Sequence, residues 1–208
     1  MAIILGLLVG AAFIYFYAFQ DGGTSSSTEA SRSEPGASSQ ESGDQALAVL
    51  LAADGVPIAS ARGVDNKGAQ PAVGSPAPNF KMQLPDGETV TLNDLKGHPM
   101  IINFWATWCP PCRREMPDLI KAYEAHKDEG LVVLEVNSAE APVQVEAFIK
   151  EFGVTAPVVI DARNEVLGVY RTNGLPASFF IDKDGVIQAH WPGFLDANTL
   201  NQLLAEIL

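Results

Sequence analysis

The sequence of 208 residues predicts an α/β fold in which helices pack against a mixed β-sheet. Between residues 100 and 169, short apolar runs of strand length alternate with segments whose apolar residues recur at helical spacing. On either side of that region, two strand-like segments are joined by turn residues, and a helical stripe follows at the C-terminus. Alternating strands and helices favour parallel neighbours and hairpins favour antiparallel ones, so the sheet should be mixed.

The first segment, residues 2–19, consists only of apolar or small residues. As a helix it would span about 27 Å, close to the thickness of a bilayer core. Bulky aromatic residues occupy the place where a signal peptidase requires small ones, so we predict an uncleaved transmembrane signal-anchor over residues 1–20 that attaches the protein to the membrane. No Lys or Arg precedes this segment, so charge does not define its orientation.

The next segment, residues 21–72, is rich in Ser, Gly and Ala and is predicted to be a flexible linker. Its few large apolar residues could not offset the entropy of ordering the chain. A short helix could form over residues 45–53, and its placement is left open. The folded domain is expected to cover residues 73–208.

That domain is predicted to begin with an N-terminal β-hairpin, "NFKMQL" and "TVTL", joined by Pro-Asp-Gly turn residues. The continuous apolar runs "MIINFW" (100–105) and "LVVLEV" (131–136) are typical of buried strands. A helix that ends at Gly130 should connect them, because apolar residues recur there at helical spacing. The residues of that stripe are Met116, Leu119, Ile120 and Tyr123.

A helical insert should follow, beginning at Pro142 and ending at Gly153. "APVVI" is then predicted as a short strand and "NEVLGVY" as a short helix. "ASFFID" and "VIQAHW", joined by "KDG", form a second predicted hairpin. The chain should end in a helix whose core face consists of Leu200, Leu203, Leu204 and Ile207.

Composition narrows the classes of function. The formal net charge of −12 argues against a nucleic-acid partner, because phosphate binding requires clustered Lys and Arg. The three histidines are scattered and are expected to be ordinary surface or half-buried residues. The two cysteines have C-x-x-C spacing without a second pair of metal ligands, so we expect neither a metal nor another cofactor.

The two cysteines, Cys109 and Cys112, lie where a buried strand meets a helix. Cys109 is expected at the helix N-cap with Pro110 at the first helical position. Unpaired N–H groups and the positive end of the helix dipole would then stabilise a thiolate at Cys109 and lower its pKa below about 8.5. Cys109 is therefore the predicted attacking thiol and Cys112 the resolving thiol of a redox-active disulfide. So short a ring would add little as a permanent crosslink.

The surrounding stretch "INFWATWCPPCRREMP" resembles the thioredoxin superfamily, and within it the membrane-tethered TlpA-like and ResA-like thiol–disulfide oxidoreductases. The resemblance extends from "GSPAPNF" to the C-terminus, and the insert at 142–152 is similar to one that the TlpA-like branch adds. It implies a thioredoxin fold. Pro117 stands where the family kinks the active-site helix.

The same resemblance implies further site residues. Pro176 matches the family's cis-proline, and the backbone of Leu175 and Pro176 would pair with a substrate strand. Trp108, Pro110 and Pro111 complete the implied substrate-binding set.

Glu115, three residues after Cys112, matches an active-site acid of the ResA-like branch. If partly buried, it should have a raised pKa and could carry the proton of the resolving thiol. Asn103 stands where thioredoxin has a buried Asp in the strand, so that base is absent.

The implied function is the reduction of disulfides in extracytoplasmic proteins, with apocytochrome c as the ResA-like substrate and a membrane thiol reductase as electron donor. The predicted location is the cell membrane, with a single span and an extracytoplasmic catalytic domain. Pro111 replaces the His found before the second Cys in strongly oxidising relatives, which favours a reductant.

Two other activities are known on folds of this type, and the motif departs from both. A peroxiredoxin-type peroxidase needs a Thr where this chain has Ala106. A copper chaperone on the same fold would use C-x-x-x-C, which is one residue longer than the spacing here.

Overall fold

A computed structural model describes residues 35–208 of the chain, which belong to one compact unit. The predicted anchor over residues 1–20 and the first part of the predicted linker lie outside the described residues. Across residues 35–208, the helices are too short or too polar to span a lipid bilayer.

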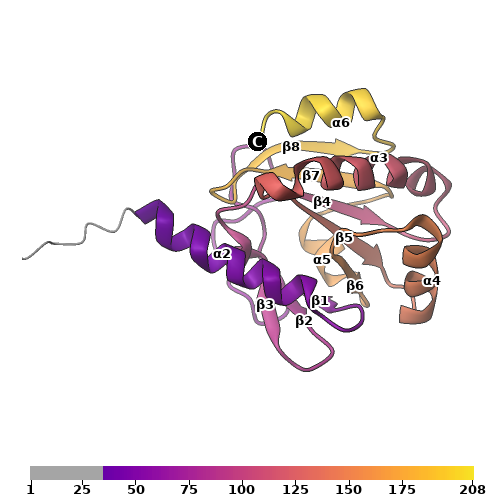
Figure 1. The fold of residues 1–208 in the computed structure, drawn as a ribbon, viewed down its shortest axis with the longest axis horizontal. Helices are drawn as coiled ribbons and strands as arrows, with labels where there is room; N and C mark the ends of the chain where they lie inside the picture. Colours follow the sequence, from indigo (N-terminus) through magenta and orange to yellow (C-terminus); the bar gives the residue numbers. More distant parts are fainter. Residues whose placement is uncertain (1–34) are drawn as a thin grey trace, which may run out of the picture. The chain divides into compact units, whose positions relative to one another are not determined.

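The centre of the fold is an eight-stranded sheet with the order β3-β2-β1-β6-β5-β4-β7-β8 (Figure 1). The strands β1, β6, β5 and β4 are parallel to one another, whereas the pairs β2–β3 and β7–β8 add antiparallel strands at the two sides. The prediction of a mixed sheet is therefore confirmed. The strands are β1 (Ile58–Ser60), β2 (Lys81–Gln83), β3 (Thr89–Thr91), β4 (Met100–Trp105), β5 (Val132–Ser138), β6 (Val158–Asp161), β7 (Ala177–Ile181) and β8 (Ile187–Pro192).

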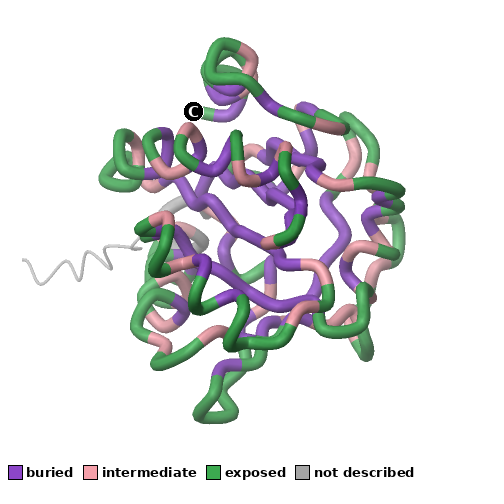
Figure 2. Tube along the Cα trace, turned by 90° about the vertical axis from the view of Figure 1, so that its right-hand side faces the viewer, coloured by how far each residue is buried: buried purple, intermediate pink, exposed green. Residues whose placement is uncertain are grey.

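Helices cover both faces of the sheet. Apolar residues of α3, α4 and α6 form one core against the sheet, and those of α2, the 3₁₀ helix η1 and α5 form a second core on the opposite face. Figure 2 shows the central strands buried along their length, with exposed segments around them. The helices are α2 (Pro35–Leu51), η1 (Leu92–Leu95), α3 (Pro110–His126), η2 (Lys127–Glu129), α4 (Pro142–Phe152), α5 (Glu165–Val169) and α6 (Ala197–Leu204).

Local sequence signals explain where α3 and α4 begin and where the α3–η2 segment and α4 end. Proline occupies the first position of α3 and of α4, where its missing N–H costs nothing. Gly130 and Gly153 adopt the left-handed conformation, with φ of 91° and 65°, and end the α3–η2 segment and α4 respectively. The two predicted hairpins are also present, although β2 and β3 are only three residues long.

The linker prediction needs correction from residue 35 onward. Residues 35–51 form the long helix α2 rather than a short helix over 45–53. Residues 58–60 form β1, which is inserted in the sheet between β2 and β6, with Ala59 opposite Met82 and Ile58 opposite Ile160. The folded unit therefore includes residues 35–72, which lie before the predicted boundary at Val73.

Close contacts explain why α2 is ordered despite its many small polar residues. Leu50 is buried in the second core. A Cβ on Gly43 would lie 2.5 Å from the carbonyl oxygen of Lys96, so glycine permits this approach. His98, expected at or near the surface, is instead buried, and its ring contacts Gly130 O through Nδ1 at 2.9 Å and Asp44 through Nε2 at 3.2 Å.

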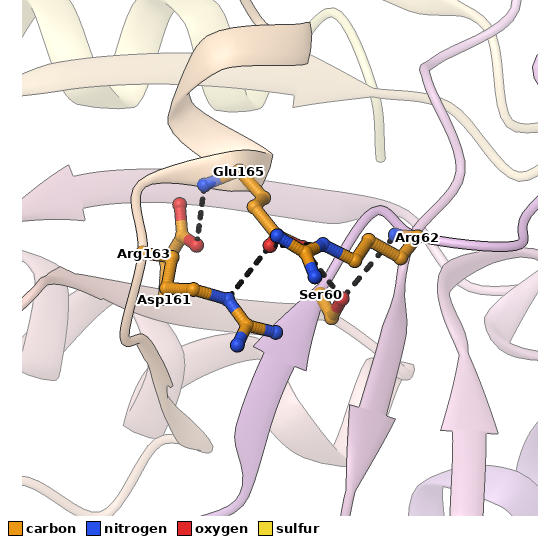
Figure 3. A network of polar contacts seen from close by, with 5 residues as sticks. All are labelled: Ser60, Arg62, Asp161, Arg163 and Glu165. Atoms are coloured by element: carbon orange, nitrogen blue, oxygen red, sulfur yellow. Dashed lines mark hydrogen bonds and ion pairs between the residues drawn. The ribbon is translucent and has the colours of Figure 1, made fainter.

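A polar network connects the end of β1 to the segment between β6 and the start of α5 (Figure 3). Ser60 Oγ donates to Glu165 at 2.7 Å, and the guanidinium groups of Arg62 and Arg163 pair with the same carboxylate at 2.6 and 2.8 Å. The backbone N–H of Glu165 in turn donates to Asp161 at 2.8 Å. The end of β1 is thus attached to the start of α5, which strengthens its place in the sheet.

Candidate active site

The two cysteines form a disulfide at the start of α3. Cys109 is the N-cap residue in extended conformation, and its sulfur accepts the backbone N–H of Cys112 at 3.3 Å. Cys109 is 3% exposed and Cys112 is fully buried, so of the two cysteine residues only Cys109 contacts solvent. The helix N–H groups and dipole are therefore placed to stabilise negative charge on Cys109 after the disulfide opens.

A carboxylate from a distant loop fixes the turn that precedes Cys109. Glu140 accepts the backbone N–H and the hydroxyl of Thr107, at 2.6 and 2.5 Å. The side chain of Asn137, at the end of β5, also donates to Glu140 at 2.7 Å. Sequence reasoning did not identify Glu140, because nothing in its local pattern indicates a contact with the cysteine loop.

Pro176 lies beside the cysteine loop and follows a cis peptide bond, as the resemblance implied. In the antiparallel pairing of β4 and β7, Phe104 is opposite Ala177, so Pro176 stands next to the end of β4 from which the cysteine loop departs. Pro176 is buried and its carbonyl accepts the N–H of Gly193 at 2.8 Å, whereas Leu175 is half-buried. A pocket of about 360 Å³ extends along residues 171–177 and the end of β8.

Exposed aromatic side chains occur directly before the disulfide, at the end of β8 and in the turn that follows β8. Trp108 is 67% exposed immediately before Cys109. Trp191 and Phe194 are also exposed, and the indole N–H of Trp191 donates to the carbonyl of Phe194 at 3.0 Å. Because Arg114 of α3 lies over the Phe194 ring, this turn after β8 belongs to the same region as the cysteines. Trp191 and Phe194 were not among the predicted site residues.

Glu115 is buried in α3, one helical turn beyond Cys112. Its two oxygens accept the side-chain amide of Asn103 at 2.9 Å and the backbone N–H of Leu195 at 2.8 Å. Burial raises the pKa of Glu115 to about 7, although both hydrogen bonds act to lower it. A carboxyl with this pKa can accept and release a proton at neutral pH.

A second buried carboxyl, Glu135 on β5, was missed at the sequence level. Burial, and then the negative charge of Glu115, raise the pKa of Glu135 well above its ordinary value. The available signal was a single Glu inside the otherwise apolar run "LVVLEV", which is expensive to bury unless it serves a purpose or stays protonated.

The side chains of Arg113 and Arg114 contact residues other than the cysteines. Arg113 pairs with Glu151 of α4 and lies over the rings of Phe148 and Phe152. Within the described part of the chain, neither Arg113 nor Arg114 donates a hydrogen bond to a cysteine sulfur. No cluster of three or more potential metal-ligating side chains occurs among residues 35–208.

The mixed sheet, the disulfide at a helix N-terminus and the adjacent cis-proline define a thioredoxin-like thiol–disulfide oxidoreductase. The chain belongs to the AhpC/TSA family, whose model matches residues 73–190.

Similar sequences and similar solved structures support the assignment to this class of enzyme. The chain is 38% identical to "Thiol-disulfide oxidoreductase ResA" of Geobacillus kaustophilus over 77% of its own length and 91% of that protein. It is 40% identical to the protein of the same name from Bacillus subtilis over 55% of this chain and 64% of the relative.

Among solved structures, StoA from Bacillus subtilis superposes with a TM-score of 0.52 at 33% identity, over 65% of this chain and 98% of that one. The "putative Thiol:disulfide interchange protein DsbE" from Chlorobium tepidum superposes with a TM-score of 0.60 at 28% identity, over 65% of this chain and 96% of that one.

Proposed function

We propose that this enzyme is anchored in the cell membrane by residues 1–20 and reduces disulfides in extracytoplasmic proteins. The observation that carries the proposal is the placement of Cys109 at the N-cap of α3, the helix that also carries the buried Glu115, with the cis-proline before the adjoining end of β7. This arrangement supplies a stabilised thiolate, a surface for the substrate backbone and a proton carrier.

In the first step, the thiolate of reduced Cys109 attacks one sulfur of the substrate disulfide. A bond forms between Cys109 and that sulfur, and the other substrate sulfur leaves as a thiolate. We assign the exposed ring of Trp108, the first helical residues Pro110 and Pro111, and the backbone of Leu175 and Pro176 to substrate contact.

In the second step, Glu115 as a carboxylate takes the proton of the Cys112 thiol. The Cys112 thiolate attacks Cys109 and re-forms the disulfide between the two cysteines. The substrate sulfur that was bonded to Cys109 is released and takes up the proton. The substrate gains two electrons and the enzyme loses two. A membrane thiol reductase would return these electrons, and no bound cofactor is needed.

The name ResA carried by the relatives supports one substrate in particular. Apocytochrome c contains a C-x-x-C-H motif whose cysteines must be reduced before haem attachment. We therefore propose apocytochrome c as a substrate among secreted and membrane proteins with disulfides.

The substitution Cys112→Ser tests the order of attack. Without a resolving thiol, the mixed disulfide through Cys109 should accumulate and appear in cells as higher bands on non-reducing gels. The matched control Cys109→Ser should trap nothing. Failure to recover a trapped extracytoplasmic protein, or equal trapping by both variants, would contradict the proposal.

The reduction potential of the unsubstituted protein, which has both cysteines, tests the direction of electron transfer. A reductant should equilibrate with thiol buffers below about −150 mV, and a higher potential would make the enzyme an oxidant. Peroxide consumption by the purified protein in the presence of a thiol reductant would instead favour the peroxidase chemistry known among thiol enzymes of this fold.

A further inference from the structure

Three neighbouring strands place polar side chains in one row on the sheet face beneath α3. In the register of the sheet, Asn103 on β4 is opposite Glu135 on β5 and opposite Ser178 on β7. The three residues are buried on the face whose other residues belong to the core beneath α3, α4 and α6. Glu115 of α3 contacts this row of side chains because it accepts a hydrogen bond from Asn103.

The side-chain amide of Asn103 has one unsatisfied atom. Its nitrogen donates to Glu115 and to Ser178, both at 2.9 Å, which uses both amide hydrogens. The carbonyl oxygen, Oδ1, is buried without a partner. Because the nitrogen is engaged toward β7, the oxygen is left for the β5 side, where Glu135 is the strand neighbour.

Glu135 has the complementary defect. Its Oε2 atom is buried without a hydrogen-bond partner. The strand neighbours are Asn103 on β4 and Val158 on β6, and the charged group that acts on Glu135 is Glu115, which has the same sign. An ionised carboxylate here would be buried beside a carbonyl oxygen and another carboxylate, which is costly.

A proton on Glu135 resolves both defects at once. The neutral acid is a hydrogen-bond donor, and Asn103 Oδ1 is an unpartnered acceptor on the adjacent strand. The indole N–H of Trp105 on β4 is also a donor, but it too is buried without a partner, so Oδ1 accepts no bond from it.

We propose that Glu135 is a permanently protonated acid whose O–H donates to Asn103 Oδ1, and that it is thereby the positioning residue for Glu115. The bond holds the Asn103 amide in the orientation that presents N–H to Glu115. In the flipped orientation, the Asn103 carbonyl would face the Glu115 carboxylate. The inference rests on the proposed role of Glu115 as proton carrier and adds the residue that sets its proton affinity.

The proposal predicts opposite behaviour for two substitutions. Glu135→Gln keeps a neutral donor of the same shape, so the pKa of Glu115 should stay near 7. Glu135→Leu removes the donor and releases the Asn103 amide. Because the bond from Asn103 lowers the pKa of Glu115, its loss should raise that pKa further. A rise of about one unit would reduce the carboxylate fraction of Glu115 at neutral pH, and with it the rate of the second step, about fivefold.

The measurement is a carbon NMR titration of the oxidised full-length protein labelled at the Glu side-chain carboxyl carbon, with signals assigned by Glu115→Gln and Glu135→Gln. In the unsubstituted protein, the Glu135 signal should stay at its protonated position across the whole pH range in which Glu115 titrates. This titration decides the protonation state even if Glu135→Leu fails to fold.

Three results would overturn the proposal. They are ionisation of Glu135 within that range, an equal shift of the Glu115 pKa in both Glu135 variants, and an unchanged Glu115 pKa in Glu135→Leu. The proton-carrier role fails separately, if Glu115→Gln exchanges disulfides at the rate of the unsubstituted protein across pH.

Discussion

The raised pKa of Glu115 predicts a specific pH dependence of stability. In the unfolded chain the carboxyl ionises near 4.5, whereas in the folded protein it ionises at about 7. Between these values the folded protein keeps a proton that the unfolded chain has released, so the free energy of unfolding falls as pH rises through this window. At about 1.4 kcal/mol per pH unit, the loss reaches about 3 kcal/mol above neutral pH.

The substitution Glu115→Gln should remove this loss, because glutamine has the shape of the neutral acid and does not titrate. Relative to the unsubstituted protein, the variant should gain about 3 kcal/mol between about pH 4.5 and about pH 8, on top of a pH-independent offset from altered hydrogen bonds. Urea unfolding of both oxidised proteins measures the difference. In the oxidised state neither cysteine titrates, and Glu135 is present in both proteins.

The result that would refute this reasoning is a stability difference that does not vary with pH. It would mean that Glu115 ionises at the same pH in the folded and unfolded chains, and that its burial is relieved in solution. A difference that changes in the opposite direction would mean that its hydrogen bonds from Asn103 and Leu195 outweigh burial.

Two further predictions concern the packing around the sheet. Gly43→Ala should undock α2, because the new Cβ would lie 2.5 Å from Lys96 O. Faster amide hydrogen exchange confined to α2 would demonstrate the undocking, and unchanged protection of α2 would contradict this prediction. Tyr170→Phe should cost about 1–2 kcal/mol in urea unfolding, because the buried hydroxyl donates to Pro78 O at 2.8 Å and its loss leaves that carbonyl unpaired; a cost below about 0.5 kcal/mol would show that the bond is dispensable.

Prediction from sequence succeeded where one local signal determines the structure. "MIINFW" is buried throughout and forms β4 over the predicted residues, and α4 runs from Pro142 to the residue before Gly153. It failed over residues 35–60, where composition alone resembles a linker. There order comes from contacts with distant residues, such as the approach of Gly43 to Lys96 and the pairing of Ile58 with Ile160, which no local pattern reveals.

The candidate site shows the same division. Cys109 and Cys112 were predicted from their spacing and neighbours, and Glu115 from the resemblance to the ResA-like branch, all within one short stretch of chain. Glu135 and Glu140 are brought to that stretch by strand register and loop contacts, so their involvement depends on tertiary structure. Asn103, interpreted from sequence as the loss of a base, also donates to Glu115 and lies opposite Glu135 in the sheet.

The position of β1 has a consequence for how the chain folds. This strand joins the β2–β3 hairpin to the parallel strands. Its residue Ile58 pairs with Ile160 on β6, which lies more than a hundred residues later in the chain. Closing so long a loop carries a large entropic cost, and contacts of this kind slow folding. During synthesis from the N-terminus, residues 58–60 emerge long before β6 exists. We expect β1 to be among the first strands to be synthesised and among the last to complete its pairing, because that pairing requires β6.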